Sequence, residues 1–168
     1  MTYSTLGPIV VAVIRRTATT NDQAAYARMR VQTLLRQPDE WLPRIRFGAG
    51  RRWYERIVRE PDHEIWLLSW LPDDGTGFHD HAGSAGAFAV ALGSLEEREI
   101  RDGVTIRRPR NSGEISSFHP GYIHEVINVS EAPAVSLHAY APPLTAMNRY
   151  ELREHGPAFA TRENASDW

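Results

Sequence analysis

Residues 77–93 read GFHDHAGSAGAFAVALG, and this stretch decides the fold. Its second half, residues 86–92, is a run of small and aliphatic residues ended by Gly93, which is typical of a buried β-strand. Its first half places His79 and His81 two residues apart. Side chains two apart on a strand leave the same face, so we expect both imidazoles to be able to bind one metal ion.

The chain that flanks this stretch follows a similar pattern. Short runs rich in aliphatic and aromatic residues are separated by turn residues such as Gly75, Gly103 and Gly121. Many short strands with no helices between them predict an all-β protein, either a sandwich or a small closed barrel. The predicted strands cover residues 64–71, 77–81, 86–92, 94–100, 103–108, 115–118, 124–129 and 133–141.

The amino-terminal third is predicted to be mostly helical. Apolar residues recur at the spacing of one helical face between Thr20 and Gln37. Thr20 followed by Gln23 offers a capping box at the start of this helix. The segment Arg51 to Arg59 is predicted to form another helical turn or two. We therefore expect one domain over residues 1–168, with a helical part at about 1–60 and a β-barrel at about 61–152.

Composition indicates an ordinary soluble domain. The 168 residues are 42% hydrophobic and 24% charged, with a formal net charge of -2. This charge gives no reason to expect a nucleic-acid partner. An arginine cluster at Arg107, Arg108 and Arg110 is short, is broken by Pro109 and has acidic neighbours. We predict that it lies in a solvated turn.

Cysteine is absent, which excludes disulfides, thiolate metal ligands and a thiol nucleophile. The apolar run from Ile9 to Ile14 is far shorter than a membrane span and is predicted to be a buried first strand. We therefore expect no membrane partner and a cytoplasmic, monomeric protein.

A third histidine comes from a later strand-like run. Residues 121–128 read GYIHEVIN, which places His124 within a predicted strand. Imidazole binds iron, zinc, copper and nickel well, so His79, His81 and His124 are the predicted metal ligands. The other histidines that we weighed are expected to be solvated or nonligating: His63, His119 and His155.

These residues resemble the metal-binding pattern of the cupin superfamily. That pattern has two histidines separated by one residue, a later glutamate and a glycine, then a second motif with glycine, histidine and asparagine. The glutamate position falls at Gly86, so the carboxylate ligand is missing. A three-histidine site without the glutamate is the mark of the cysteine dioxygenase family. The matching positions are His79, His81, Gly93, Gly121, His124 and Asn128.

The resemblance to cysteine dioxygenases covers roughly residues 53–150. The segment AVSLHAYAPPL at residues 134–144 looks like the family's Ser-x-His-x-Tyr signature. This implies that Ser136, His138 and Tyr140 lie beside the iron, with Tyr140 as a hydroxyl donor held by the other two.

A second segment of the resemblance concerns the substrate. The string YERIV at residues 54–58 resembles the family's substrate-carboxylate segment and implies that Tyr54 and Arg56 bind the substrate, while Trp70 fits the tryptophan before the histidine pair. Mammalian members carry a cysteine at the position of Gly86 that becomes linked to the active-site tyrosine. Bacterial members have glycine there, so the chain resembles the bacterial, arginine-type members, in which no crosslink can form.

The resemblance implies Fe2+ as cofactor and oxidation of L-cysteine by O2 to cysteine sulfinate. Three neutral imidazoles leave three positions of an octahedral ferrous ion open. An incoming thiolate would restore the negative charge that a carboxylate ligand would have supplied. A small thiol that also carries an amine suits such a site.

Three alternatives stay open from the sequence. Relatives specialised for 3-mercaptopropionate usually place glutamine at the position of Arg56, so Arg56 favours cysteine over that acid. Three histidines also bind catalytic zinc for hydrolysis or hydration. Some cupins without enzymatic activity are metal-binding sensors. The identity of the bound metal separates the zinc alternative, and oxygen uptake on adding cysteine separates the sensor.

Overall fold

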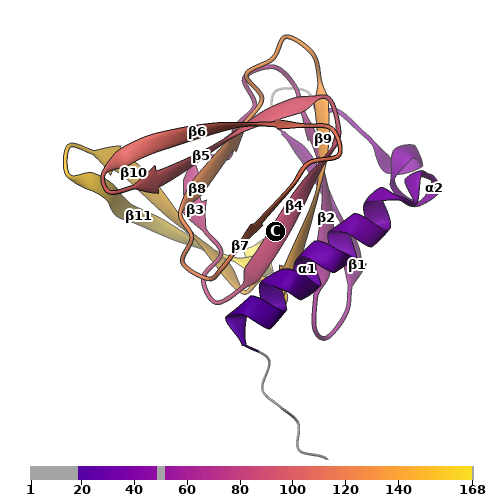
Figure 1. Cartoon of the computed structure of the whole chain (residues 1–168), viewed down its shortest axis with the longest axis horizontal. Coiled ribbons are helices and arrows are strands. Elements are labelled where there is room, and N and C mark those ends of the chain that lie inside the picture. The colour runs from indigo at the N-terminus through magenta and orange to yellow at the C-terminus, as the bar shows by residue number, and fades with distance from the viewer. Residues whose placement is uncertain (1–18, 49–51, 168) are drawn as a thin grey trace, which may run out of the picture.

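The structure is a computed structural model that describes residues 19–48 and 52–167. Within these residues eleven strands form two antiparallel sheets that enclose a shared interior (Figure 1). The five-stranded sheet has the order β1 (Trp53–Arg59), β2 (Glu64–Trp70), β9 (Ala134–Ala141), β4 (Ala85–Leu92) and β7 (Ile115–Phe118). The six-stranded sheet has the order β11 (Gly156–Asn164), β10 (Ala146–Arg153), β3 (Phe78–Asp80), β8 (His124–Ile127), β5 (Ser94–Arg101) and β6 (Val104–Asn111).

The central strands of the five-stranded sheet are buried on both faces, and this explains their apolar sequences. Every residue of β9 is buried. Val135, Leu137 and Ala139 face a hydrophobic cluster that includes Val31 of helix α1 (Thr20–Leu35). The alternate residues of β9 face the barrel interior. Figure 1 shows α1 running along the outer side of this sheet. The predicted all-β fold with a helical amino-terminal segment is confirmed.

Helix α1 begins one residue earlier than the predicted capping box. Thr19 is the N-cap, and its hydroxyl accepts from the backbone N–H of Asp22 at 3.2 Å. The Asp22 carboxylate accepts in turn from the backbone N–H of Thr19 at 2.9 Å. An anionic acceptor in the first turn also interacts favourably with the helix dipole. The aspartate therefore takes the role that we had predicted for Gln23.

Short helical segments follow α1. They are α2 (Pro38–Trp41) and the 3-10 turn η1 (Leu42–Arg44), and a second 3-10 turn, η2 (Ala165–Asp167), follows β11. Pro38 disfavours further helix in the residue before it, so α1 ends at Leu35 rather than at the predicted Gln37. No helix in the described ranges is long and apolar enough to span a membrane.

The prediction of a helix over residues 51–59 was wrong for the part that the structure describes. Trp53–Arg59 is strand β1, paired with β2 through a hairpin. The aromatic and β-branched residues of this segment, such as Tyr54, Ile57 and Val58, pack on a sheet better than on a helix. The register of β1 shifts between Arg56 and Val58. Such a bulge interrupts the alternation of apolar and polar residues that would have indicated a strand. The predicted strand over Ile9–Ile14 lies outside the described residues.

The arginine cluster lies in a strand and not in a solvated turn. Arg108 and Arg110 belong to β6, where they form ion pairs with Glu99 and Glu97 of the neighbouring β5. Pro109 is tolerated because β6 is the last strand of its sheet.

Two strands were not predicted, β10 and β11. They form a hairpin that extends the sheet beyond the expected limit at residue 152. Many of their residues are exposed, including Leu152 and Phe159. The hairpin therefore lacks the alternation of apolar and polar residues that marks a half-buried strand.

Leu137→Ala is expected to lower the free energy of unfolding by about 2–5 kcal/mol, because Leu137 is fully buried between the sheet and the amino-terminal segment. Denaturant unfolding of the metal-free protein measures this loss. Leu152→Ala is the control, since Leu152 is 53% exposed, and its effect should stay within about 0.5 kcal/mol. Equal effects of the two substitutions would contradict the packing described.

Candidate metal centre

Three histidines converge in the interior of the barrel. His79 on β3 pairs across the ladder with His124 on β8, and His81 follows directly after β3. All three are buried, and one ring nitrogen of each lies within 4.8 Å of those of the other two. Three nitrogens on one face of an ion, each about 2.1 Å from it, lie about 3.0 to 3.4 Å apart. The side chains therefore need to approach by up to about 1.8 Å to hold one metal ion.

The hydrogen bonds of His79 and His124 leave Nε2 of each ring free to bind a metal ion. Nδ1 of His79 lies 2.9 Å from the carbonyl oxygen of Gly77, and Nδ1 of His124 lies 3.0 Å from Oε1 of Glu97. Both partners only accept, so each Nδ1 carries the proton and each Nε2 keeps a lone pair. Both ring nitrogens of His81 are buried without a partner in the described structure. A bound metal ion would satisfy one nitrogen of this ring.

Burial also keeps His79 and His81 neutral. It lowers the pKa of His79 and of His81 well below the ordinary value, and the neighbouring histidines add to this effect. Glu97 behaves differently. Burial raises its pKa, but hydrogen bonds from His124, Arg110 and Ser116 outweigh burial and leave the pKa at about 2. The interior thus holds neutral imidazoles next to one ionised carboxylate.

A chain of hydrogen bonds links Trp70 to Tyr140. The indole Nε1 of Trp70 donates to Oγ of Ser136 at 2.8 Å, and the same Oγ lies 2.8 Å from Nε2 of His138. Nδ1 of His138 lies 3.5 Å from the hydroxyl of Tyr140. In the arrangement that satisfies every atom of this chain, Ser136 donates to Nε2 of His138, and Nδ1–H of His138 donates to the hydroxyl oxygen of Tyr140. The proton of the Tyr140 hydroxyl then remains available to a bound molecule.

Tyr140 lies beside the three histidines. Its ring centroid is 4.9 Å from that of His81. Burial raises the pKa of Tyr140 above its ordinary value and lowers the pKa of His138 to about 3. The phenol is therefore protonated and His138 is neutral at physiological pH. The structure brings together Ser136, His138 and Tyr140, which the sequence had grouped. Trp70, which the sequence had placed with the substrate-binding residues, is fully buried, does not line the pocket and joins this group instead.

Phe118 occupies the space next to Gly86. Gly86 pairs with Phe118 on β7 and with Tyr140 on β9. A Cβ atom at Gly86 would come to 2.4 Å from the Phe118 ring and 2.8 Å from the carbonyl oxygen of Ala139. Phe118 in turn stacks on His81, with centroids 4.5 Å apart. Neither a glutamate ligand nor a cysteine at position 86 fits beside this ring.

Tyr140 also lines a pocket. Its walls are partly apolar and carry two guanidinium groups, those of Arg52 and Arg149. The lining residues are Arg52, Tyr54, Trp66, Leu68, Tyr140, Leu144, Met147, Arg149 and Glu163.

The two pocket arginines are held by different contacts. Arg52 lies over the Trp70 ring at 4.8 Å and donates from Nη1 to the carbonyl oxygen of Gly75 at 2.7 Å. Its buried Nε has no partner in the described part of the chain. Burial, with Arg149 nearby, lowers the pKa of Arg52. Arg149 bonds to Glu163 at 2.7 Å. Arg52 therefore keeps an unused donor in a partly buried position.

The structure does not bring Arg56 into this pocket. Arg56 lies over the Trp66 ring at 5.3 Å and pairs with the buried carboxylate of Glu64 at 3.4 Å. Tyr54, which the resemblance assigned to substrate binding, does line the pocket. Sequence reasoning missed Arg52 and Arg149. Arg52 directly precedes β1, but Arg52 and Arg56 are both two residues from Tyr54, so spacing did not distinguish them, and Arg149 lies on the unpredicted β10.

The remaining histidines lie apart from the three ligands. His119 and His155 are exposed. His63 was predicted to be solvated, and this was wrong, because it is buried beneath helix α1. Its ring accepts from Arg30 at 3.0 Å and contacts Asp62 at 2.8 Å. A long-range contact with α1, which the local turn pattern did not reveal, buries it.

A three-histidine site inside a two-sheet antiparallel barrel defines a metal-binding cupin, and solved structures share this fold. The protein TT1209 from Thermus thermophilus superposes with a TM-score of 0.55 at 22% identity, covering 61% of this chain and 94% of that one. A double-stranded beta-helix protein from Klebsiella pneumoniae gives 0.52 at 19% identity over 70% and 90% of the two chains. An RmlC-like cupin from Desulfovibrio desulfuricans gives 0.51 at 21% identity over 60% and 91%.

The chain belongs to the cysteine dioxygenase type I family, whose sequence profile matches residues 3–153. Cysteine dioxygenase type 1 of Danio rerio is 28% identical over 132 residues, which cover 69% of this chain and 64% of that protein. The Bos taurus protein is 27% identical over 131 residues with the same coverage. The chain thus spans slightly less than two thirds of the length of the curated relatives it matches.

Replacing His79, His81 or His124 by alanine is expected to remove most of the bound metal, because no further histidine or carboxylate among the described residues joins this cluster. Elemental analysis of protein loaded with Fe2+ under anaerobic conditions measures the loss. His155→Ala, at an exposed position, is the control and should keep full metal content. Equal loss in that variant would overturn the ligand assignment.

Gly86→Ala is expected to destabilise the protein by about 1–3 kcal/mol, because the added methyl group collides with the Phe118 ring and with backbone. Denaturant unfolding gives the change. Gly83→Ala is the comparison, since a Cβ there meets nothing within 4 Å. A Gly86 variant as stable as the Gly83 variant would show that the barrel yields easily at this point.

Proposed function

We propose that this protein is a non-heme iron thiol dioxygenase that converts L-cysteine to cysteine sulfinate. The observation that carries the proposal is a buried set of three histidines beside a pocket with two arginines. In the net reaction the thiol S–H group becomes a sulfinic acid group, O2 is the oxidant, and both of its oxygen atoms enter the product. Membership of the cysteine dioxygenase type I family supports this chemistry.

The cofactor of the proposal is Fe2+, held by His79, His81 and His124. When bound, it would supply the positions at which a thiolate and O2 meet and would favour the deprotonated thiol. The residues around it exclude bulk water, since His79, His81, His124 and Phe118 are all buried. They include no carboxylate ligand, so a thiolate would be the first anionic ligand of the ion.

Arg52 and Arg149 are proposed to bind the carboxylate of the substrate. Both line the pocket that ends at Tyr140, and a guanidinium binds a carboxylate through charge-assisted hydrogen bonds. Arg52 has an unused Nε–H for this purpose. Arg56, the sequence-based candidate, is engaged with Glu64. Tyr54 lines the same pocket and would add a hydroxyl.

Tyr140 is proposed to donate a hydrogen bond to the reacting thiol or to oxygen. His138 holds its hydroxyl oxygen, so the phenolic proton points away from His138. Ser136 and Trp70 fix His138 in the tautomer that this arrangement requires. The polar chain therefore orients one donor toward the site and needs no change of protonation to do so.

A second thiol is also supported. The two arginines suit any small thiol that carries a carboxylate, and Glu163, the acidic residue of the pocket lining, is paired with Arg149. 3-Mercaptopropionate therefore fits the same contacts. A zinc hydrolase or a metal-binding sensor would use the same ligands without consuming O2.

Oxygen consumption by the Fe2+-loaded protein tests the proposal. Cysteine, 3-mercaptopropionate and cysteamine are compared, and mass spectrometry of the product should show the gain of two oxygen atoms. A preference for 3-mercaptopropionate would show that this acid, and not cysteine, is the substrate, and the proposed dioxygenase reaction would stand. Protein that binds iron but consumes no O2 with any of these thiols would overturn the dioxygenase proposal.

Arg52→Gln and Arg149→Gln are each expected to lower kcat/KM for cysteine about ten- to a hundredfold, since a hydrogen bond to a charged group contributes roughly 1.5 to 3 kcal/mol. Activity with cysteamine, which has no carboxylate, should change little. Arg56→Gln is the matched comparison and should retain cysteine activity. A selective loss in Arg56→Gln, with Arg52→Gln unaffected, would restore Arg56 as the carboxylate-binding residue.

A further inference from the structure

Glu97 is a buried carboxylate that lies behind the metal site. It belongs to β5, where Leu95, Glu97 and Glu99 point inward in alternation. Its side chain is fully buried. It is not among the three side chains that converge on the metal position. A buried charge of this kind is costly unless several partners satisfy it.

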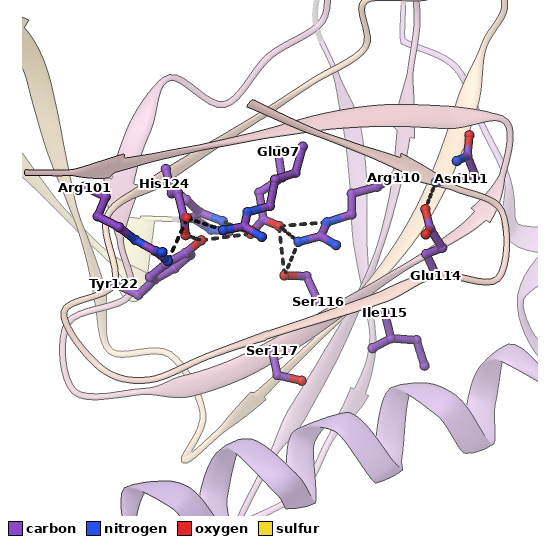
Figure 2. Close-up of polar contacts among 12 residues, drawn as sticks. Glu97, Arg101, Arg110, Asn111, Glu114, Ile115, Ser116, Ser117, Tyr122 and His124 are labelled. Atoms are coloured by element: carbon purple, nitrogen blue, oxygen red, sulfur yellow. Dashed lines mark hydrogen bonds and ion pairs between the residues drawn. The ribbon is translucent and has the colours of Figure 1, made fainter. Parts of the chain in front are cut away.

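The two oxygens of Glu97 have separate partners, as Figure 2 shows. Oε1 accepts from Nδ1 of His124 at 3.0 Å, and the Tyr122 hydroxyl, which donates to Glu99 at 2.6 Å, lies 3.5 Å from the same oxygen. Oε2 accepts from Arg110 through Nε at 2.9 Å and Nη2 at 2.6 Å, and from Ser116 at 2.8 Å. Three hydrogen bonds on one oxygen prevent the carboxylate from rotating. The other oxygen is thereby held at the ring of a metal ligand.

The three ligands differ in what supports them. His79 donates to a neutral backbone carbonyl, and His81 has no partner in the described structure. His124 donates to an anion. A carboxylate at Nδ1 fixes the tautomer and makes the imidazole a stronger donor at Nε2. The site has no carboxylate ligand at position 86. The negative charge of Glu97 instead acts on the metal position through its hydrogen bond from His124.

We propose that Glu97 is a positioning residue for the metal centre, which locks His124 in its binding tautomer and increases its donor strength, and that Arg110 and Ser116 hold Glu97 in place for this task. The inference rests on the proposed metal site and not on which thiol is oxidised. Glu97 is not one of the three converging histidines, and His124 is the ligand to which it is hydrogen-bonded, so its effect on the metal position passes through His124.

Glu97→Gln is the direct test. Arg110 and Ser116 still donate to the amide oxygen, so the amide N–H2 faces Nδ1 of His124. Two donors then oppose each other unless the His124 proton moves to Nε2, where it blocks the metal. The dissociation constant for Co2+, measured by competition with a chelator in the absence of thiol, should rise about ten- to a hundredfold.

Glu99→Gln is the matched control. Glu99 lies on the same strand and inner face and is directly across from His124 in the ladder. It bonds to Tyr122 and Arg108 and has no hydrogen bond to the His124 ring. The Glu99→Gln substitution removes one negative charge from the same strand face as Glu97→Gln does. The Co2+ dissociation constant of this variant should stay within about twofold of wild type, since the ligand tautomer is untouched.

Two further substitutions, at Ser116 and Ser117, test the inference even if the Glu97 variant does not fold. Ser116→Ala removes one hydrogen bond from Oε2 and should weaken Co2+ binding by about two- to tenfold. Ser117→Ala, at the exposed neighbouring position, should not change it. Unfolding of the apo and Co2+-saturated proteins adds a second readout. A purely structural role for Glu97 would lower both stabilities equally and leave the Co2+ affinity unchanged, and that result would overturn the inference.

The two proposals fail in different ways. Wild-type protein that binds Co2+ tightly and oxidises no thiol would refute the proposed function and leave the role of Glu97 standing. Equal Co2+ affinities of wild type and the folded Glu97→Gln variant would refute the role of Glu97 and leave the proposed function standing.

Discussion

The burial of polar side chains between two sheets is the constraint on which the rest of this structure depends. A buried polar group without a partner is costly, and the barrel interior contains histidines, a tyrosine, a serine and a glutamate. Ser136, His138 and Glu97 are satisfied by fixed neighbours. The ring of His81 is not, within the described residues. The rule that stabilises the interior therefore also marks the point at which a ligand is needed.

The two sheets contribute different parts of the site. The six-stranded sheet and the turn after β3 supply the three histidines and Glu97, so they control the charge and the tautomers at the metal position. The five-stranded sheet supplies Trp70, Ser136 and Tyr140, which orient one phenolic proton. The five-stranded sheet can bury this polar face because α1 covers its other face with apolar side chains.

Gly86 connects the fold to the chemistry. The resemblance to cupins places a glutamate ligand at this position, and mammalian cysteine dioxygenases place a cysteine there. Phe118 fills the space that either side chain would need. The same ring stacks on His81 and so holds a metal ligand. A single aromatic residue thus excludes both a fourth ligand and a crosslink to Tyr140, and the negative charge near the metal comes from Glu97 instead.

The sequence by itself determined the features that depend on spacing along one strand. His79 and His81 share a face because they are two residues apart, and the same spacing groups Ser136, His138 and Tyr140. The fold class followed from the short strands and their turns. The tertiary structure alone decided which charged groups meet, because register and competition for partners set those contacts. Glu64 engages Arg56 and leaves the pocket to Arg52 and Arg149. Arg110 meets Glu97 because β6 pairs with β5, and no local pattern encodes a contact between strands whose register is fixed only when both sheets close.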